Sequence, residues 1–176
     1  MLVLPIDSTV ESLLDQSSPH SPLRQRAGSF RVLAALALAR AGDSKRAKMP
    51  AAGLRLEFPS DTILNRYWLP AIEAAVQLSK GDSAGALGRL DIARPSEFGQ
   101  PSGFQGLAIS PMIPVYLRGE SYLAAGKGPE ATTEFEAMLR RPALAQNYPL
   151  QCLARLGLAR AAALRGDSSK AAGLYH

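Results

Sequence analysis

The chain has 176 residues, of which 47% are hydrophobic, 20% charged and 6% aromatic, and its formal net charge is +5. These values are typical of a soluble protein of about one domain. No stretch is long and apolar enough for a transmembrane helix, and the opening MLVLPIDS lacks the basic leader and apolar core of a secretory signal. The sequence therefore favours a cytoplasmic location, or an extracytoplasmic one if the chain follows a membrane anchor in a longer protein.

Two regions are expected. Residues 1–22 read as a short helix over 7–16 followed by a linker rich in serine and proline. Residues 23–176 read as helical pairs, described below in chain order.

The first pair starts at Pro22, which suits the first turn of a helix because it has no N–H to leave unpaired. This helix should run to about Ala41, and Asp43 or Ser44 should cap the return helix. Pro50 is expected to kink or interrupt that return helix, because proline removes a hydrogen bond within it.

The second pair begins at Ser60 or Asp61. Pro70 lies inside an otherwise helical pattern and predicts a kink one turn earlier, near Arg66. The first helix of this pair is expected to end at Gly81.

Residues 95–111 contain three glycines and three prolines, which indicates an ordered loop or extended segment and not a helix. Phe98 and Phe104 are too apolar for a freely solvated loop, so we expect them to hold it against the helices. Long loops of this type are often functional.

Residues 117–141 show the third pair most clearly. Gly126 is a natural helix stop and Pro129 a natural helix start. Gly119 and Ala131 are small enough to let the two helices approach closely. A fourth pair follows, with a first helix over about 149–165 and a return helix so short that it suggests a fragment or a truncated product.

The third pair recurs along the chain when glycines are aligned on Gly126, at Gly42, Gly81 and Gly166. A small residue stands seven positions before each glycine and an alanine five positions after it: Ala35, Ala74, Gly119 and Ala159, then Ala47, Ala86, Ala131 and Ala171. The intervals of 39, 45 and 40 residues exceed the roughly 34 of a standard tetratricopeptide repeat.

These marks, together with Tyr122, Phe135 and the closing Pro59, resemble the tetratricopeptide family. The resemblance implies an all-α fold, a right-handed solenoid of about four antiparallel helical hairpins with the last one incomplete. Pro50, Ala51 and Gln77 depart from the family pattern.

A closer resemblance rests on Tyr-Trp-Leu-Pro (67–70), Gly-Gln-Pro-Ser-Gly-Phe-Gln-Gly-Leu (99–107), Pro-Val-Tyr-Leu-Arg-Gly (114–119), Asn-Tyr-Pro-Leu (147–150) and the Leu-Gly-Leu-Ala-Arg-Ala run that opens residues 156–167. These segments are similar to the C-terminal repeat region of bacterial, notably acidobacterial, serine/threonine protein kinases. The resemblance implies a regulatory or partner-binding tail whose catalytic domain lies upstream, and it transfers no catalytic residue.

The sequence offers no catalytic, cofactor or metal site. His20 and His176 are remote from each other and from Cys152, which is expected to be buried in an apolar helix. Residues 81–85 match the G-x-S-x-G nucleophile motif in letters, but a helix is predicted where that motif needs a strand. Carboxylates are expected singly on helix surfaces, so no acid–base pair can be named.

A binding module without catalytic activity is therefore predicted, with a protein or peptide partner held by the first helices of the hairpins. The concave-face candidates are Arg40, Trp68, Tyr116, Glu120 and Arg160. Packing is at least as good an explanation for the two aromatic residues, and solvated surface for the three charged ones. A carboxylate clamp is not expected, because its positions hold Val32, Leu36, Ala71, Ala75 and Leu156.

Two alternatives stay open. Between residues 20 and 60, eight Lys or Arg face only Asp43 and Glu57, which suits an acidic partner or the sensor half of a transcription regulator. Nucleic acid is disfavoured, because no recognition helix or stacking aromatics accompany the charge. An enzyme on a helical scaffold would need a deep polar pocket.

Overall fold

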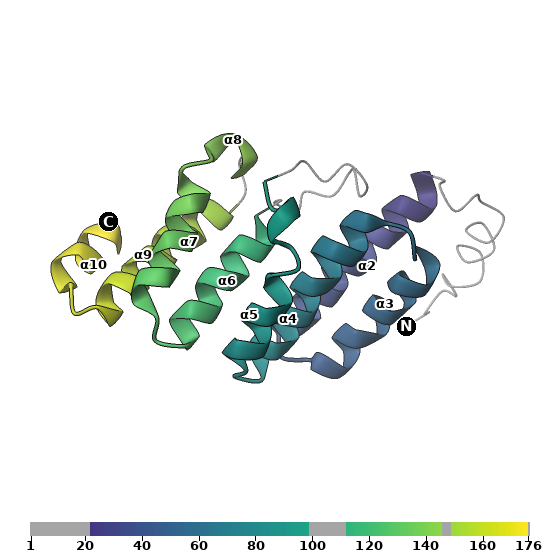
Figure 1. The fold of residues 1–176 in the computed structure, drawn as a ribbon, viewed down its shortest axis with the longest axis horizontal. Coiled ribbons are helices and arrows are strands. Elements are labelled where there is room, and N and C mark those ends of the chain that lie inside the picture. Colours follow the sequence, from purple (N-terminus) through teal and green to yellow (C-terminus); the bar gives the residue numbers. More distant parts are fainter. Residues whose placement is uncertain (1–21, 99–111, 146–148, 176) are drawn as a thin grey trace, which may run out of the picture.

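The computed structural model describes residues 22–98, 112–145 and 149–175. All regular structure in these ranges is helical, which confirms the predicted all-α class (Figure 1). The elements are α2 (Pro22–Arg40), α3 (Ser44–Glu57), η1 (Leu64–Trp68), α4 (Leu69–Ser79), α5 (Ser83–Leu90), η2 (Arg94–Ser96), α6 (Ile113–Ala124), α7 (Gly128–Leu139), α8 (Pro142–Ala145), α9 (Leu150–Leu164) and α10 (Ser168–Tyr175). The helix expected over residues 7–16, the ring of Phe104 and most of the 95–111 loop lie outside the described residues.

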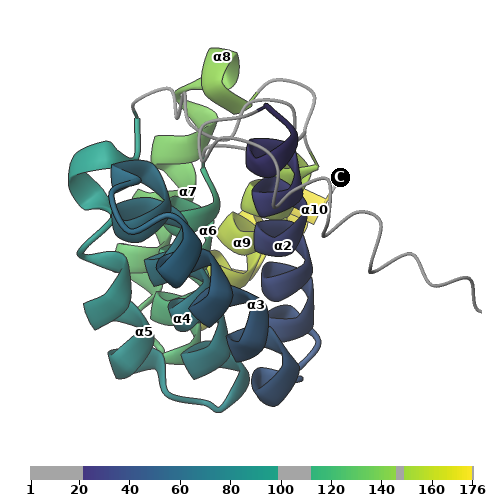
Figure 2. The same cartoon turned by 90° about the vertical axis from the view of Figure 1, so that its right-hand side faces the viewer.

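Helices that follow one another closely in sequence also contact one another. The contacting pairs are α2 with α3, α4 with α5, α6 with α7, and α9 with α10. Successive pairs contact in turn, since α4 touches both α2 and α3, α6 touches both α4 and α5, and α9 touches both α6 and α7. The pairs follow one another along the longest axis, and the view along that axis shows α2 and α3 in front (Figures 1 and 2).

The turn inside each pair is built around a glycine with positive φ. At the first turn, Gly42 has φ of 84°, a conformation that only glycine adopts at little cost. Its N–H donates to the Ala39 carbonyl, and the N–H of Asp43 donates to the Leu38 carbonyl. This is the Schellman motif, which satisfies carbonyl groups that the ending helix leaves free. Equivalent pairs of hydrogen bonds occur at Gly81, Gly126 and Gly166.

The residue after each glycine starts the next helix. The carboxylate of Asp43 accepts a hydrogen bond from the backbone N–H of Arg46, so Asp43, rather than Ser44, is the N-cap of α3. Asp82 and Asp167 play the same part for α5 and α10. Lys127 occupies this place before α7 and has no side-chain capping bond.

Two prolines lie within helical segments without ending them. Of the two effects predicted for Pro50, a kink or an interruption, the interruption does not occur, because α3 continues through it. Ala47 and Leu54, on either side of it, are fully buried, so packing holds both halves in place. Before Pro70 the chain forms the π-helical turn η1, in which the Leu69 N–H donates to the Leu64 carbonyl. This wider turn stands where the sequence predicted a kink, and it accommodates a residue without an N–H.

The small residues of the repeat frame lie where helices meet. Ala35, Ala74, Gly119 and Ala159 are buried on the first helix of each pair, and Ala47, Ala86, Ala131 and Ala171 on the second. One close approach surrounds Phe135 of α7, whose ring is fully buried. A Cβ added at Gly119 of α6 or at Gly157 of α9 would lie 2.5 Å from that ring. Phe135 therefore fits between two neighbouring helices only because both carry glycine there.

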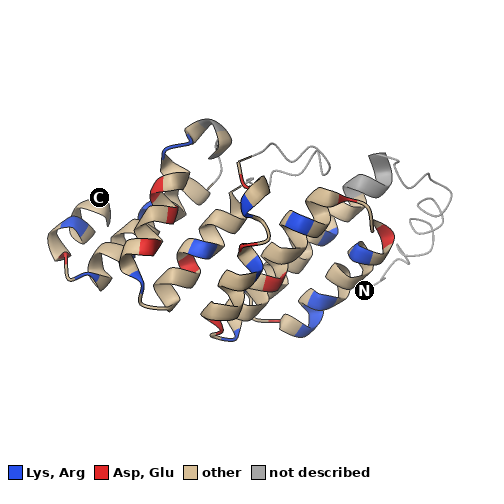
Figure 3. Cartoon of the chain, in the orientation of Figure 1, with Lys and Arg blue, Asp and Glu red and all other residues tan. Residues whose placement is uncertain are grey.

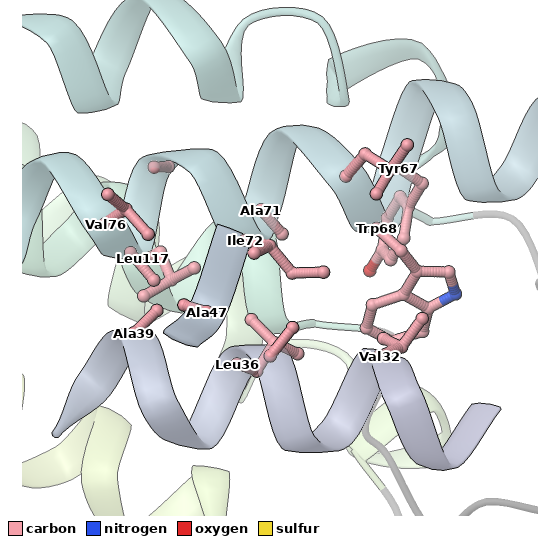
Figure 4. Close-up of a cluster of buried hydrophobic side chains, with 14 of the residues drawn as sticks. Val32, Leu36, Ala39, Ala47, Tyr67, Trp68, Ala71, Ile72, Val76 and Leu117 are labelled. Atoms are coloured by element: carbon pink, nitrogen blue, oxygen red, sulfur yellow. The ribbon is translucent and has the colours of Figure 1, made fainter. Parts of the chain in front are cut away.

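Two hydrophobic clusters form the core. One joins α2 to α5 and includes Trp68, which lies against Val32 of α2 (Figure 4). The other joins α6, α7 and α9 around Phe135. No helix in the described ranges combines the length and apolar character that a membrane crossing requires.

Cys152 contradicts its prediction, because its side chain is exposed on α9. The buried residues of α9 begin with Leu150, Ala154, Gly157 and Leu158, a face that residue 152 does not share. The apolar residues around it in sequence made this position resemble core.

Candidate functional site

Four of the five predicted binding residues lie together, on three different helices. Glu120 of α6 accepts a hydrogen bond from Arg40 of α2 at 3.2 Å and lies 3.5 Å from the guanidinium of Arg160 on α9. The Arg40 guanidinium is also 5.5 Å from the centre of the Tyr116 ring. We call these four residues the α2–α6–α9 cluster. Its members are separated by up to 120 positions in sequence, so only the fold brings them together.

Tyr116 is the buried member of the cluster and contacts both Arg40 and Glu120. Its side chain is buried, and burial, assisted by the nearby Glu120 carboxylate, raises the pKa of its hydroxyl above the ordinary value, while Arg40 acts against this shift. The hydroxyl thus stays protonated near neutral pH. Tyr116 can fix the positions of Glu120 and Arg40, but its ring offers little surface to a partner.

An open groove adjoins the cluster between α6 and α9. It has a volume of about 600 Å³, and it is lined by Glu120, Leu123, Ala124, Arg160, Ala163 and Leu164. Glu120 pairs with two arginines, so the net charge of the cluster is +1. The arrangement offers both ionic and apolar contacts to a polypeptide.

The fifth predicted residue, Trp68, is only 3% exposed and belongs to the core. Its ring packs edge-on against Tyr67 with a centroid distance of 4.9 Å, and its indole lies over Val32 (Figure 4). The prediction that it contacts a partner does not fit this position. Its aromatic character serves the contact between α2 and the π-helical turn.

A second groove lies between α3, α4 and α5, and the sequence did not suggest it. Its volume is about 560 Å³. Buried residues of α4, namely Leu69, Ile72 and Val76, form its floor, and exposed cationic side chains stand at its edges. We call it the α3–α4–α5 groove.

A buried ion cluster joins the segment after α5 to α6 and α7. The Arg118 guanidinium of α6 donates to both carboxylate oxygens of Glu97, one of these bonds being 2.7 Å long, and to Glu134 of α7 at 2.9 Å. Arg118 and Glu97 are almost fully buried. The expectation that carboxylates occur only singly on helix surfaces is therefore wrong. The one sequence signal was an arginine within an otherwise apolar stretch of helix.

This cluster holds structure together and does not suit proton transfer. Burial lowers the pKa of Arg118, but its hydrogen bonds to Glu97 and Glu134 outweigh that effect and hold the pKa above the ordinary value. The guanidinium therefore stays charged and keeps both carboxylates paired. Next to it, the Arg141 guanidinium lies 3.8 Å from the centre of the Phe98 ring, so the start of the predicted loop is held against the helices, as expected for Phe98.

The Gly-Asp-Ser-Ala-Gly segment at residues 81–85 is a turn between two helices. Asp82 uses its carboxylate to cap the Gly85 N–H, and α4 precedes the segment where a nucleophile elbow would need a strand. Within the described ranges, no group of three or more His, Cys, Asp or Glu side chains could hold a metal ion.

Comparisons with known proteins add no relative. No family model matches the chain, and neither the curated proteins nor the solved structures gave a match.

Proposed function

We propose that this chain is a non-catalytic protein–protein interaction module. In this proposal the contacting pairs are tetratricopeptide-like hairpins stacked into a right-handed solenoid, whose first helices form the binding face. The observation that carries the proposal is the α2–α6–α9 cluster, in which side chains from three separate pairs form one continuous polar surface beside an apolar groove. A surface assembled from several pairs can recognise an extended peptide or a partner domain.

The wider setting is part of the same proposal. The resemblance of several segments to the repeat tails of bacterial serine/threonine protein kinases supports a place in the regulatory or partner-binding tail of a signalling protein. The helical pairs and the small residues at their contacts are consistent with that setting.

The alternative, a sensor half of a transcription regulator that faces nucleic acid, has less support. Its motive was the excess of basic residues between positions 20 and 60, yet several of these are paired. Arg31 binds Glu57, Arg46 lies near Asp43, and Arg40 and Arg55 bind Glu120 and Glu73. Paired charges of this kind contribute little to phosphate binding. A salt-dependent gel shift with generic DNA would favour the alternative.

Selection of peptides tests the interaction module directly. A random peptide library displayed on phage is selected against the full chain, and affinities of the recovered peptides are measured by fluorescence anisotropy. We expect a double variant, Arg40→Glu with Arg160→Glu, to weaken binding about tenfold, because each exposed ion pair is worth up to about 1 kcal/mol and the variant reverses both charges.

The matched control reverses two other exposed arginines, Arg46→Glu with Arg140→Glu, each of which also has one local acidic partner. It should bind peptides as the unaltered chain does. Failure to recover any specific peptide would refute the interaction module, and equal binding by both double variants would remove the α2–α6–α9 cluster from it.

A further inference from the structure

The α3–α4–α5 groove combines an apolar floor with an excess of positive charge at its edges. Its apolar lining is Ala51, Ala52, Leu56, Leu69, Ile72 and Val76. Leu56 is 83% exposed, although it lies at the side of a groove between helices. A leucine left so open on a folded surface gains from being covered.

Four cationic side chains and one carboxylate line the groove. Glu73 of α4 binds Arg55 of α3 at 3.1 Å and lies 3.4 Å from the Arg89 guanidinium of α5. Lys48 and Lys80 also line the groove, and no ion pair joins either of them to a carboxylate among the described residues. Lys and Arg also outnumber Asp and Glu along α3 (Figure 3). The net charge of the side chains that line the groove is thus +3.

We propose that this groove docks an acidic segment of a partner protein that carries leucine- or phenylalanine-sized anchors. The anchors would cover the floor and Leu56, and neighbouring Asp or Glu side chains would pair with Lys48 and Lys80. This inference rests on the proposed function, and it assigns a second surface and the chemical class of the partner. The groove lies apart from the α2–α6–α9 cluster and shares no lining residue with it.

The lining argues for a polypeptide and against nucleic acid. None of the groove's lining residues is aromatic, so bases would find no stacking platform. Six of the lining residues are aliphatic, and such a surface suits apolar anchors and gives nothing to a phosphate backbone. The mixture of apolar floor and cationic edge is complementary to an acidic amphipathic peptide.

The test uses the same phage-displayed random peptides and the full chain. We expect one class of recovered peptides to combine Asp or Glu with Leu, Met or Phe, and to bind less tightly as salt is raised. The double variant Lys48→Glu with Lys80→Glu should weaken these peptides about tenfold. The matched control, Lys127→Glu with Lys170→Glu, reverses two exposed lysines outside the groove and should leave binding unchanged.

A second variant separates apolar contact from charge alone. Ala52 is exposed on α3, so Ala52→Arg should fold normally while its bulk obstructs the floor. If apolar anchors matter, the variant weakens acidic peptides despite its added positive charge. If it instead strengthens them, attraction is purely electrostatic and the proposal is wrong.

Three outcomes would overturn the docking site. Recovered peptides could be basic, peptide binding could ignore the groove variants, or the groove's two lysines could prove necessary for binding DNA or phosphatidylserine vesicles instead. Peptides that are sensitive to Arg40→Glu with Arg160→Glu but not to the groove variants would leave the interaction module standing and remove only this site. Recovery of no specific peptide would refute both.

Discussion

The contact of Phe135 with two glycines predicts an unusual response to a substitution that normally stabilises helices. Replacing a glycine inside a helix with alanine gains about 0.5–1 kcal/mol, because alanine loses less conformational freedom on folding. At Gly119 and Gly157 the structure predicts the opposite sign. An added Cβ at either position would lie 2.5 Å from ring atoms of Phe135, well inside van der Waals contact.

The magnitude follows from how little the ring can move. Phe135 is fully buried, and glycine positions on two different helices enclose it, so a shift away from one brings it toward the other. Overpacking of this kind costs about 1–3 kcal/mol. After subtracting the intrinsic gain of alanine, we expect Gly119→Ala or Gly157→Ala to lower the free energy of unfolding by about 1 kcal/mol, within a range of about 0–2.5 kcal/mol.

Urea unfolding followed by circular dichroism measures the difference, with Gly88→Ala as the matched control. Gly88 lies within α5, and no atom lies within 4 Å of a Cβ built there, so this variant should be stabilised. The double variant Gly119→Ala with Phe135→Leu should lose less stability than the two single variants lose in total, because the smaller leucine side chain relieves the overlap with the added Cβ. If Gly119→Ala proved as stable as Gly88→Ala, α6 and α7 could not approach as closely as the Phe135 contact requires.

Three further substitutions test other parts of the structure. Arg118→Met should cost about 3–5 kcal/mol, because it leaves the buried Glu97 without its cation and Glu134 with only the more distant Arg94, 3.9 Å away. Arg118→Lys should recover little, since a lysine cannot form paired bonds to both carboxylates; urea unfolding measures both variants, and near-neutral effects would contradict the buried cluster. Lys127→Asp should raise the free energy of unfolding by about 0.5–1 kcal/mol, because it supplies the capping carboxylate that the other three turns already have; no gain would show that this turn differs from them. Cys152 should react with a water-soluble maleimide in the folded chain as fast as in urea, and protection in the folded chain would contradict its exposure.

The parts of the fold that the sequence predicted well are those governed by local chemistry. A glycine followed by a capping residue marks a turn, because few other residues tolerate positive φ and few can cap the next helix. Three turns, Gly42 with Asp43, Gly81 with Asp82 and Gly166 with Asp167, are therefore predictable from their residues alone. Small residues at fixed distances from those glycines likewise indicate the faces where helices meet.

Predictions failed where distant contacts outweigh local preference. Pro50 is a strong local signal for a break, yet the burial of Ala47 and Leu54 keeps its helix continuous. Cys152 looked like core because apolar residues surround it in sequence, but burial depends on which side of α9 meets α7. Alanine and leucine occur all round α9, so the sequence pattern does not show which of its faces is buried.

The candidate sites show the same division. Projection of a repeat onto the sequence found Arg40, Glu120 and Arg160, because equivalent positions on first helices point in similar directions. It could not show that Glu120 would face both arginines, since this depends on how tightly three pairs stack. The sequence did not indicate the α3–α4–α5 groove, because the binding positions were predicted only on the face of the first helices that the repeat pattern marks. The residues that line this groove lie elsewhere on α3, α4 and α5.

Charge pairing connects these observations with the proposed binding function. Arg118 has its charge neutralised inside the protein, where it fixes the segment after α5 against α6 and α7. Lys48 and Lys80, by contrast, meet no acidic side chain among the described residues and border an apolar floor. Cations already paired contribute stability, whereas cations without partners beside apolar surface can contribute affinity for another molecule. On this reasoning the first place to look for a partner's acidic side chains is the α3–α4–α5 groove, with the α2–α6–α9 cluster acting as a second contact.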